Sequence, residues 1–363
     1  MLFPYQFLAH PMDRMQEFVR FIFDEVWCEA VPGMNYVVET LFAAEPDLLN
    51  MITELDTQEV SGADNFLKPL HALFEKFKGL NQEQKQQFKD WFALNNDIQR
   101  LCEHGDQCQP GTYEVIKQAF PEEHFPGLVT ELKRFYKNLY SADFLKLASV
   151  KSKIGVIDDH NHKFVTLNHR DVCPFCGLSG MLNRYENKRE AYDHYFPKDK
   201  YPFNSINFYN LVPACHHCNS SYKLAKDPHI DTKDPLNIPR KVFYPFRDNQ
   251  NSIELQVTVK QADWENLERD DIELMLGPDV VADELKTWND LYGIADRYKA
   301  ECCSTGSGKA WLTEVFERAD KLKMSRQHYV ETIELDSDLD PYVDKRFLKK
   351  AFLAGCRDAK LFD

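Results

Sequence analysis

The sequence predicts an α+β protein in which a small central module lies between two largely α-helical regions. Apolar residues recur at intervals of three and four before residue 150 and after residue 251, as they do in amphipathic helices. Two Cys-x-x-Cys pairs and several strand-like segments fall between these regions. We therefore expect a helical N-terminal domain over 1–150, a central domain over 151–250 and a mainly helical region over 251–363.

The composition is that of a folded protein. The 363 residues, of which 43% are hydrophobic and 13% aromatic, are enough for about two or three packed domains. The chain contains no run of roughly 18 uncharged apolar residues, so no membrane span is expected. The N-terminal segment lacks the basic stretch, apolar stretch and cleavage site of a signal peptide. We expect a cytoplasmic protein without a membrane partner.

The region 1–150 is expected to form a helical bundle with no chemistry of its own. Helical spacing is clearest in MQEFVRFIFDEVWCEA, ADNFLKPLHALFEKFKGL and QEQKQQFKDWFALNNDIQRLC. Segments rich in proline and glycine, such as VPGMN and CQPGTY, separate these helices.

The central part begins with a change of pattern. KIGVIDDHNHKFVTL alternates around a polar DDHN turn, which predicts a β-hairpin over 153–167 with His160 and His162 as solvated turn residues. After residue 250, IELQVTVK predicts one more strand. The remaining chain returns to helical spacing, as in VADELKTWNDLYGIADRYKAEC and DKRFLKKAFLAGCRDAK.

The charge is unevenly distributed. The whole chain has a net charge of −14, but residues 151–247 hold 15 Lys+Arg against 10 Asp+Glu. Seven of the twelve histidines lie in the same segment. Because attraction to a polyanion requires local positive charge, a nucleic acid is expected to meet the central part.

Four of the ten cysteines predict a structural zinc site. Cys173, Cys176, Cys215 and Cys218 form two Cys-x-x-Cys pairs, which supply the four thiolates of a tetrahedral zinc site. Zinc with four cysteine ligands has no open coordination position, so catalysis must come from residues that the zinc holds in place. The other cysteines are expected to be small buried apolar residues: Cys28, Cys102, Cys108, Cys302, Cys303 and Cys356.

Polar residues between and after the cysteine pairs offer such chemistry. Asp193 and His194 are adjacent in YDHYFPK, Asn210 precedes LVP, and Asn219 follows the second pair directly. A helix that begins near residue 216 would place Asn219 and Lys223 on one face. Asp193 and Asn219 carry the oxygen ligands that Mg²⁺ or Mn²⁺ prefers.

The segment 171–226 resembles the HNH endonuclease family in its zinc-containing form. His194, preceded by Asp193, matches the first signature position, and Asn210 matches the central asparagine. Asn219 stands where many members have the second histidine, which makes this an HNN variant, and Lys223 matches the final basic position. The sequence departs from the family in having KDKYPFNSI where a glycine-rich turn is common.

The resemblance implies a ββα-metal fold and hydrolysis of phosphodiester bonds in DNA. It implies that His194 is the general base and that Asp193 and Asn219 hold one catalytic Mg²⁺ or Mn²⁺. Asn210 would fix the loop and orient His194. Phosphate contacts would come from Lys223, Lys198 and Lys200.

Two alternatives remain at the level of sequence: a non-catalytic zinc module that binds nucleic acid or protein, and a nuclease directed at RNA. His216 and His217 are expected to contact solvent or phosphate, with an approach to the catalytic metal as the other option. The aromatic side chains of this segment are expected to pack its core: Tyr192, Tyr195, Tyr201, Phe203, Phe208 and Tyr209. The resemblance also suggests an effector of a bacterial anti-phage or mobile-element system, with a regulatory or ATPase protein partner.

Overall fold

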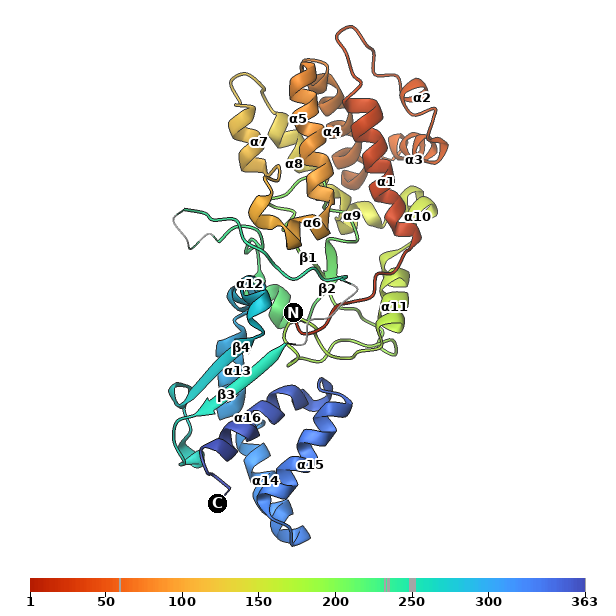
Figure 1. Cartoon of the computed structure of the whole chain (residues 1–363). Helices are drawn as coiled ribbons and strands as arrows, with labels where there is room; N and C mark the ends of the chain where they lie inside the picture. Colours follow the sequence, from red (N-terminus) through yellow and green to blue (C-terminus); the bar gives the residue numbers. More distant parts are fainter. Residues whose placement is uncertain (59, 232, 234–235, 248–252, 363) are drawn as a thin grey trace.

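The computed structural model describes residues 1–363 apart from 59, 232, 234–235, 248–252 and 363. The described chain is mostly helical, with two small antiparallel sheets of two strands each. The N-terminal helices lie at one end of the molecule and the C-terminal helices at the other, with the shorter sheet between them (Figure 1). An α+β protein with helical flanks is therefore confirmed.

The N-terminal region folds into helices, as predicted. Several begin at side chains that cap free backbone N–H groups, such as Asn81 before α5 and Thr112 before α7. The helical segments are η1 (Pro11–Asp13), α1 (Arg14–Phe21), η2 (Ile22–Trp27), α2 (Val38–Leu41), α3 (Pro46–Asp56), α4 (Ser61–Phe77), α5 (Gln82–Asn96), α6 (Ile98–Glu103), η3 (Gly105–Gln107), α7 (Tyr113–Ala119), α8 (Leu128–Leu139) and α9 (Ala142–Leu145).

The predicted hairpin over 153–167 is wrong. The chain forms two helices there, α10 (Ala148–Ile154) and α11 (Ile157–Asn168), which are separated at Gly155 with φ +77°. The buried face of α11 consists of His160, Asn161 and Phe164. Two polar residues on this face conceal the helical period in the sequence. His160 is 2% exposed, so it is not a solvated turn residue, whereas His162 is exposed as expected.

The central module contains one short hairpin followed by a helical segment. Strand β1 (Tyr192–His194) pairs antiparallel with β2 (Leu211–Pro213), so that Asp193 lies opposite Val212. The helical segment η4 (His217–Lys223) follows with π-helical geometry. A strand at NLV and a helix that begins near residue 216 are thereby confirmed.

The C-terminal region contains the second sheet and five α-helices. Strand β3 (Glu254–Val259), which was predicted, pairs antiparallel with β4 (Ile272–Gly277), which was not. Helix α16 packs along β3, and α13 packs against β4. The helical segments are η5 (Trp264–Asn266), η6 (Arg269–Asp271), η7 (Asp279–Val281), α12 (Ala282–Tyr292), α13 (Ile294–Cys303), α14 (Gly308–Leu322), α15 (Arg326–Leu339), η8 (Val343–Lys345) and α16 (Arg346–Asp358).

The buried apolar side chains of the described residues form two cores. The first core lies among helices α1 to α5 and α7 to α10 and also takes in part of the central module, namely Tyr192, Phe203, Ile206, Phe208 and Leu211. The second core joins the cysteine cluster to the C-terminal helices and to the first residues of the chain, Met1 to Tyr5. The β1–β2 hairpin therefore contributes side chains to both cores.

Polar contacts tie the loop between β1 and β2 to the N-terminal helices. The side-chain amide of Asn95 donates to the carbonyl oxygen of Pro202 at 3.1 Å. The side-chain amide of Asn204 donates to the carbonyl oxygen of Asn95 at 3.0 Å. The hydroxyl of Ser205 donates to the carbonyl oxygen of Tyr136 at 2.6 Å. These buried hydrogen bonds fix the loop against α5 and α8. Among the described residues, no helix is long and apolar enough to cross a membrane.

Candidate functional site

The four cysteines predicted from their spacing come together as one buried cluster. The sulfur atoms of Cys173, Cys176, Cys215 and Cys218 all lie within 4.8 Å of one another. Four thiolates at such separations can surround one ion tetrahedrally. The cluster is therefore placed to bind a zinc ion, as the sequence predicts. Of the other cysteines, all are buried except Cys303, which is half-buried.

Backbone N–H groups and one arginine point at the sulfur atoms. The N–H of Leu178 donates to Cys176 Sγ at 3.5 Å, and the N–H of Cys218 donates to Cys215 Sγ at 3.4 Å. Arg297 of α13 donates to Cys218 Sγ at 3.3 Å and lies 4.5 Å from the centre of the Tyr222 ring. Because these donors favour thiolates over thiols, they favour the form of cysteine that binds metal.

Hydrogen bonds among the thiols lower the pKa values of Cys176 and Cys215, whereas the pKa values of Cys173 and Cys218 are raised. Hydrogen bonds from Cys173 and its neighbours, with a smaller contribution from Arg297, hold the pKa of Cys176 well below its usual value. A hydrogen bond from Cys173 is also the main reason that the pKa of Cys215 falls to about 7. Thiols of lowered pKa lose their protons more readily to an incoming zinc ion.

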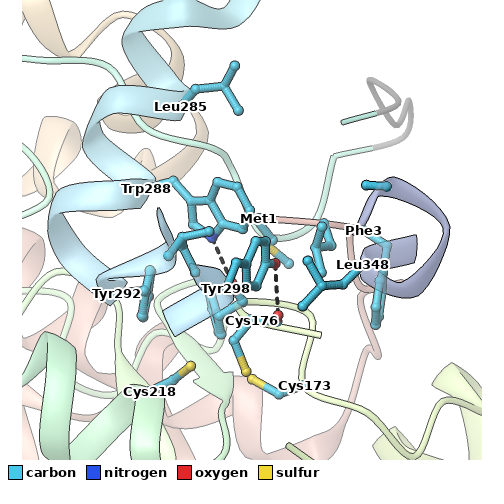
Figure 2. Packing of buried hydrophobic residues seen from close by; sticks show 14 of the residues in the cluster. Met1, Phe3, Cys173, Cys176, Cys218, Leu285, Trp288, Tyr292, Tyr298 and Leu348 are labelled. Atoms are coloured by element: carbon cyan, nitrogen blue, oxygen red, sulfur yellow. Dashed lines mark hydrogen bonds between the residues drawn. The ribbon is translucent and has the colours of Figure 1, made fainter. Parts of the chain in front are cut away.

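The C-terminal helices cover the cysteine cluster. Trp288 of α12 donates to the carbonyl oxygen of Phe175 at 2.7 Å, and the hydroxyl of Tyr298 of α13 donates to that of Cys176 at 2.9 Å. Figure 2 shows Trp288, Tyr292 and Tyr298 on the same side of the cysteine sulfur atoms, with Met1 and Phe3 alongside Tyr298 in the same core. The first cysteine pair is therefore held in place by residues more than one hundred positions later in the chain.

Asp193 and Lys223 form a buried ion pair. Asp193 is 4% exposed, and Lys223 is fully buried. The ammonium of Lys223 donates to Asp193 Oδ1 at 2.9 Å and to the carbonyl oxygen of His194 at 3.0 Å. Burial raises the pKa of Asp193, and Lys223 opposes that rise. In this arrangement Lys223 has no exposed surface with which to contact a phosphate, contrary to the sequence-based expectation.

The second carboxylate oxygen of Asp193 differs from the first. Asp193 Oδ2 is buried and has no hydrogen-bond partner among the described residues. A buried carboxylate oxygen without a donor is unfavourable unless a cation or a water molecule meets it.

His194 lies on β1 next to Asp193 but contacts other residues. Its Nε2 is 3.0 Å from the carbonyl oxygen of Ser205, and the ring of Tyr140 meets it edge-on at 4.7 Å between centroids. Since a carbonyl can only accept, Nε2 carries the proton and Nδ1 holds the free lone pair. Burial is the main reason that the pKa of His194 falls to about 3, and the charge of Lys198 lowers it further.

Asn210 binds the backbone of the loop between the two strands. Its Oδ1 accepts from the N–H of Phe196 at 2.7 Å, and its Nδ2 donates to the carbonyl oxygens of Phe196 at 3.0 Å and Asn204 at 3.3 Å. Asn204 directly precedes Ser205, the partner of His194. Asn210 therefore acts on His194 through the loop and not by a hydrogen bond of its own.

The remaining predicted residues are only partly brought together. Asn219 is half-buried on η4, and its side-chain amide makes no hydrogen bond to another described residue. His216 and His217 are exposed and belong to no metal-ligand cluster of the described chain. Lys200 pairs with Asp227 at 3.6 Å, and Lys198 lies 5.4 Å from the centre of the Tyr140 ring. The aromatic side chains of this segment are buried as predicted, except that Tyr209 is 43% exposed.

Sequence reasoning missed the residues that the N-terminal helices supply to this site. Tyr140 directly follows α8, far from the motif, and its ring packs against His194. Burial raises the pKa of Tyr140, and the positive charge of Arg189 opposes this rise. Only tertiary structure joins these positions, so no local pattern in the sequence could have identified Tyr140.

Comparison of the chain with protein-family models, with curated proteins and with solved structures finds no match in any of the three. The function of the chain must therefore be inferred from its own residues and from the resemblance of its central motif.

Proposed function

We propose that this protein is a metal-dependent endonuclease of the HNH type that hydrolyses phosphodiester bonds in DNA. The main support is the geometry of one small module: β1 carries Asp193 and His194, Asn210 braces the loop behind them, and η4 returns beside β1. The four-cysteine cluster fixes the start of η4 relative to the segment that precedes β1.

The chemistry of Asp193 suits a divalent cation. Its buried Oδ2 lacks a donor among the described residues, which is the situation that a bound cation would relieve. In the proposal, Asp193 and Asn219 hold one Mg²⁺ or Mn²⁺. When bound, this ion would neutralise charge on the scissile phosphate and stabilise the leaving oxygen.

His194 is the proposed general base. Its Nε2–H is held by the carbonyl of Ser205, which leaves Nδ1 to take a proton from the attacking water. Burial keeps the ring neutral, as a base must be, but also makes it a weak base. A phosphate bound beside the ring would raise the pKa of His194 because negative charge favours the imidazolium.

Asn210 and Lys223 are proposed as positioning residues. Asn210 holds the loop that presents Ser205 to His194, and Lys223 holds the carboxylate of Asp193 and the backbone of His194. Lys198, which is half-buried close to His194, is the better candidate for a phosphate contact.

The first prediction concerns cleavage. Purified protein with Mg²⁺ or Mn²⁺ should cut supercoiled plasmid or linear DNA, and His194→Ala should reduce the rate by about 10²-fold or more because the proton acceptor is lost. Agarose-gel time courses would measure the rate, with structured RNA as a parallel substrate. Zinc should remain near one ion per chain in both proteins.

His328→Ala is the matched control, since His328 is exposed on α15 and remote in sequence from the motif. Equal cleavage by the His194→Ala and His328→Ala proteins would contradict the proposed role of His194. Cleavage of RNA alone would redirect the proposal to an RNA nuclease.

A non-catalytic zinc module is the second candidate. It is favoured by one observation: Lys223 already neutralises Asp193 in a fully buried ion pair, which closes one carboxylate oxygen to other cations. This candidate requires that the zinc-loaded protein cut no substrate with either metal.

A protein partner is proposed on the resemblance and on charge. The residues outside 151–247 hold 29 Lys+Arg against 48 Asp+Glu, so they are poorly suited to hold DNA by themselves. A regulatory or ATPase partner of a bacterial anti-phage system would deliver the substrate or license cleavage. Affinity capture from the native host would identify this partner.

A further inference from the structure

A pocket of about 600 Å³ lies between helix α11 and the segment that leads into β1. Its lining includes His162 on α11 and Arg184, Lys188 and Arg189 on the leading segment. We call this feature the basic pocket. It also contains amide side chains, which can donate to phosphate oxygens as the cations do: Asn161, Asn183 and Asn187.

The cations of the basic pocket are unusually free of carboxylate partners. Two carboxylates, Asp158 and Glu186, belong to the lining, and Asp158 is taken by Arg189 at 2.9 Å. Arg184 and Lys188 are exposed, and neither makes an ion pair with another described residue. In a chain of net charge −14, adjacent exposed cations that no described carboxylate pairs with form a local site for an anion.

The basic pocket is close to the proposed active site. Arg189 lines the pocket and lies 5.8 Å from the centre of the Tyr192 ring on β1, and its charge opposes the rise that burial causes in the pKa of Tyr140. Tyr140 in turn packs against the ring of His194. The pocket residue Arg189 therefore lies beside the strand that carries His194.

An aromatic side chain stands at the edge of the basic pocket. Tyr185 is 79% exposed, and the guanidinium of Arg184 lies 4.9 Å from the centre of its ring. An exposed tyrosine ring beside an arginine can stack on a nucleic-acid base.

We propose that the basic pocket binds the phosphate backbone of the DNA strand beside the bond to be cut, through Arg184 and Lys188. This inference rests on the proposed function for its place in the reaction, but it concerns binding and can be tested without cleavage.

The test is a binding measurement on the full-length, zinc-loaded protein. Arg184→Glu/Lys188→Glu is compared with Lys117→Glu/Lys323→Glu, both made in the His194→Ala background so that the DNA stays intact. Lys117 and Lys323 are exposed, lie outside the central module and have no ion pair with another described residue. The two double variants change the net charge equally. Any difference in their affinity for DNA must therefore come from the position of the substituted residues.

Fluorescence anisotropy with a labelled 30-base-pair duplex, over a series of salt concentrations, gives the Kd and its salt dependence. The pocket variant should bind about tenfold or more weakly, and the slope of log Kd against log salt should fall by about 2 because two phosphate contacts are lost. The control variant should bind within about twofold of the background protein. Arg184→Gln/Lys188→Gln, with circular dichroism and a zinc count, excludes misfolding as the cause.

Equal weakening by the pocket and control variants would overturn the inference, as would a defect seen with an RNA probe but not with DNA. The outcome is separable from the proposed function. Pocket-dependent binding by a wild-type protein that cuts nothing would uphold the pocket and refute the nuclease. A wild-type protein that cuts DNA, together with DNA binding that does not depend on the pocket, would uphold the nuclease and refute the pocket.

Discussion

Several residues of the central module are held by buried polar contacts. The role of such a residue can be predicted from the sequence only where it depends on a local pattern. The cysteine ligands were predictable because a zinc site demands a fixed spacing of one residue type. The pairing of Lys223 with Asp193 and the burial of His160 were not, because each depends on a partner from another element.

Gly177, which directly follows the first cysteine pair, occupies a position that only glycine fits well. It adopts φ +66°, and an added Cβ would lie 2.4 Å from Leu2 Cδ1 and 2.7 Å from Phe347 Cε1. Gly177→Ala should therefore lower the free energy of unfolding by about 2 kcal/mol or more, measured by urea denaturation. Gly33→Ala is the control, since Gly33 has φ +89° but open space around it. Equal losses in the two variants would contradict the steric part of this prediction.

His160 should make stability depend on pH. Its Nδ1 lies 2.6 Å from the hydroxyl of Tyr192, and burial lowers its pKa to about 3. The unfolded chain therefore binds more protons than the folded chain between about pH 6.5 and pH 3, so stability falls as the pH falls through this range. When the pH falls from 7 to 5, the free energy of unfolding of the His160→Gln protein should fall by about 2 kcal/mol less than that of wild type, as measured by urea denaturation.

His328→Gln, on the exposed face of α15, is the control and should lose as much stability as wild type over the same interval. A His160→Gln protein that follows the wild-type pH profile would show that His160 titrates alike in both states.

At the scale of elements, the sequence predicted those whose buried face is uniformly apolar. Helix α4 and strand β3 are of this kind, and they lie where their patterns indicate. Helix α11 is not of this kind. Its buried face contains His160 and Asn161, and these polar residues make the segment resemble a hairpin in the sequence. The arrangement of α13 against the cysteine cluster was also beyond prediction, since no local pattern joins Arg297 to Cys218.

Arg297 should determine how firmly the zinc is held. Its guanidinium donates to Cys218 Sγ, so Arg297→Met would remove a donor that stabilises the thiolate. Zinc transfer to a chromogenic chelator should become about tenfold faster. Arg269→Met, which removes an exposed partner of Asp296, should leave the transfer rate unchanged. Identical rates in the two variants would mean that Arg297 only packs against Tyr222.

At the scale of the whole molecule, the boundary expected at residue 150 does not separate two cores. Side chains of the central module complete the N-terminal core, and Phe203 lies among the rings of Phe23, Phe92 and Tyr136. Composition and periodicity identified the three segments but could not show which of them share a core, since that depends on contacts distant in sequence.

A fragment of residues 151–363 should therefore fail to fold alone. It would expose apolar side chains that the N-terminal helices bury in the whole chain, namely Tyr192, Phe203, Ile206, Phe208 and Leu211. Size-exclusion chromatography should show aggregates with well under one zinc per chain, whereas the full chain should elute as a defined species. A soluble, zinc-loaded fragment would instead restore the three-domain division.

The β1–β2 hairpin belongs to both cores, and this has a consequence for genetics. Tyr192 and Leu211 pack on the N-terminal side, whereas Val212 and Ala214 pack on the side of the cysteines. His194 takes its partners from the first side, and Asp193 takes its partner from η4. Substitutions in the two helical ends, although remote from each other, meet at these neighbouring residues. Their effects on activity should therefore show epistasis instead of adding independently.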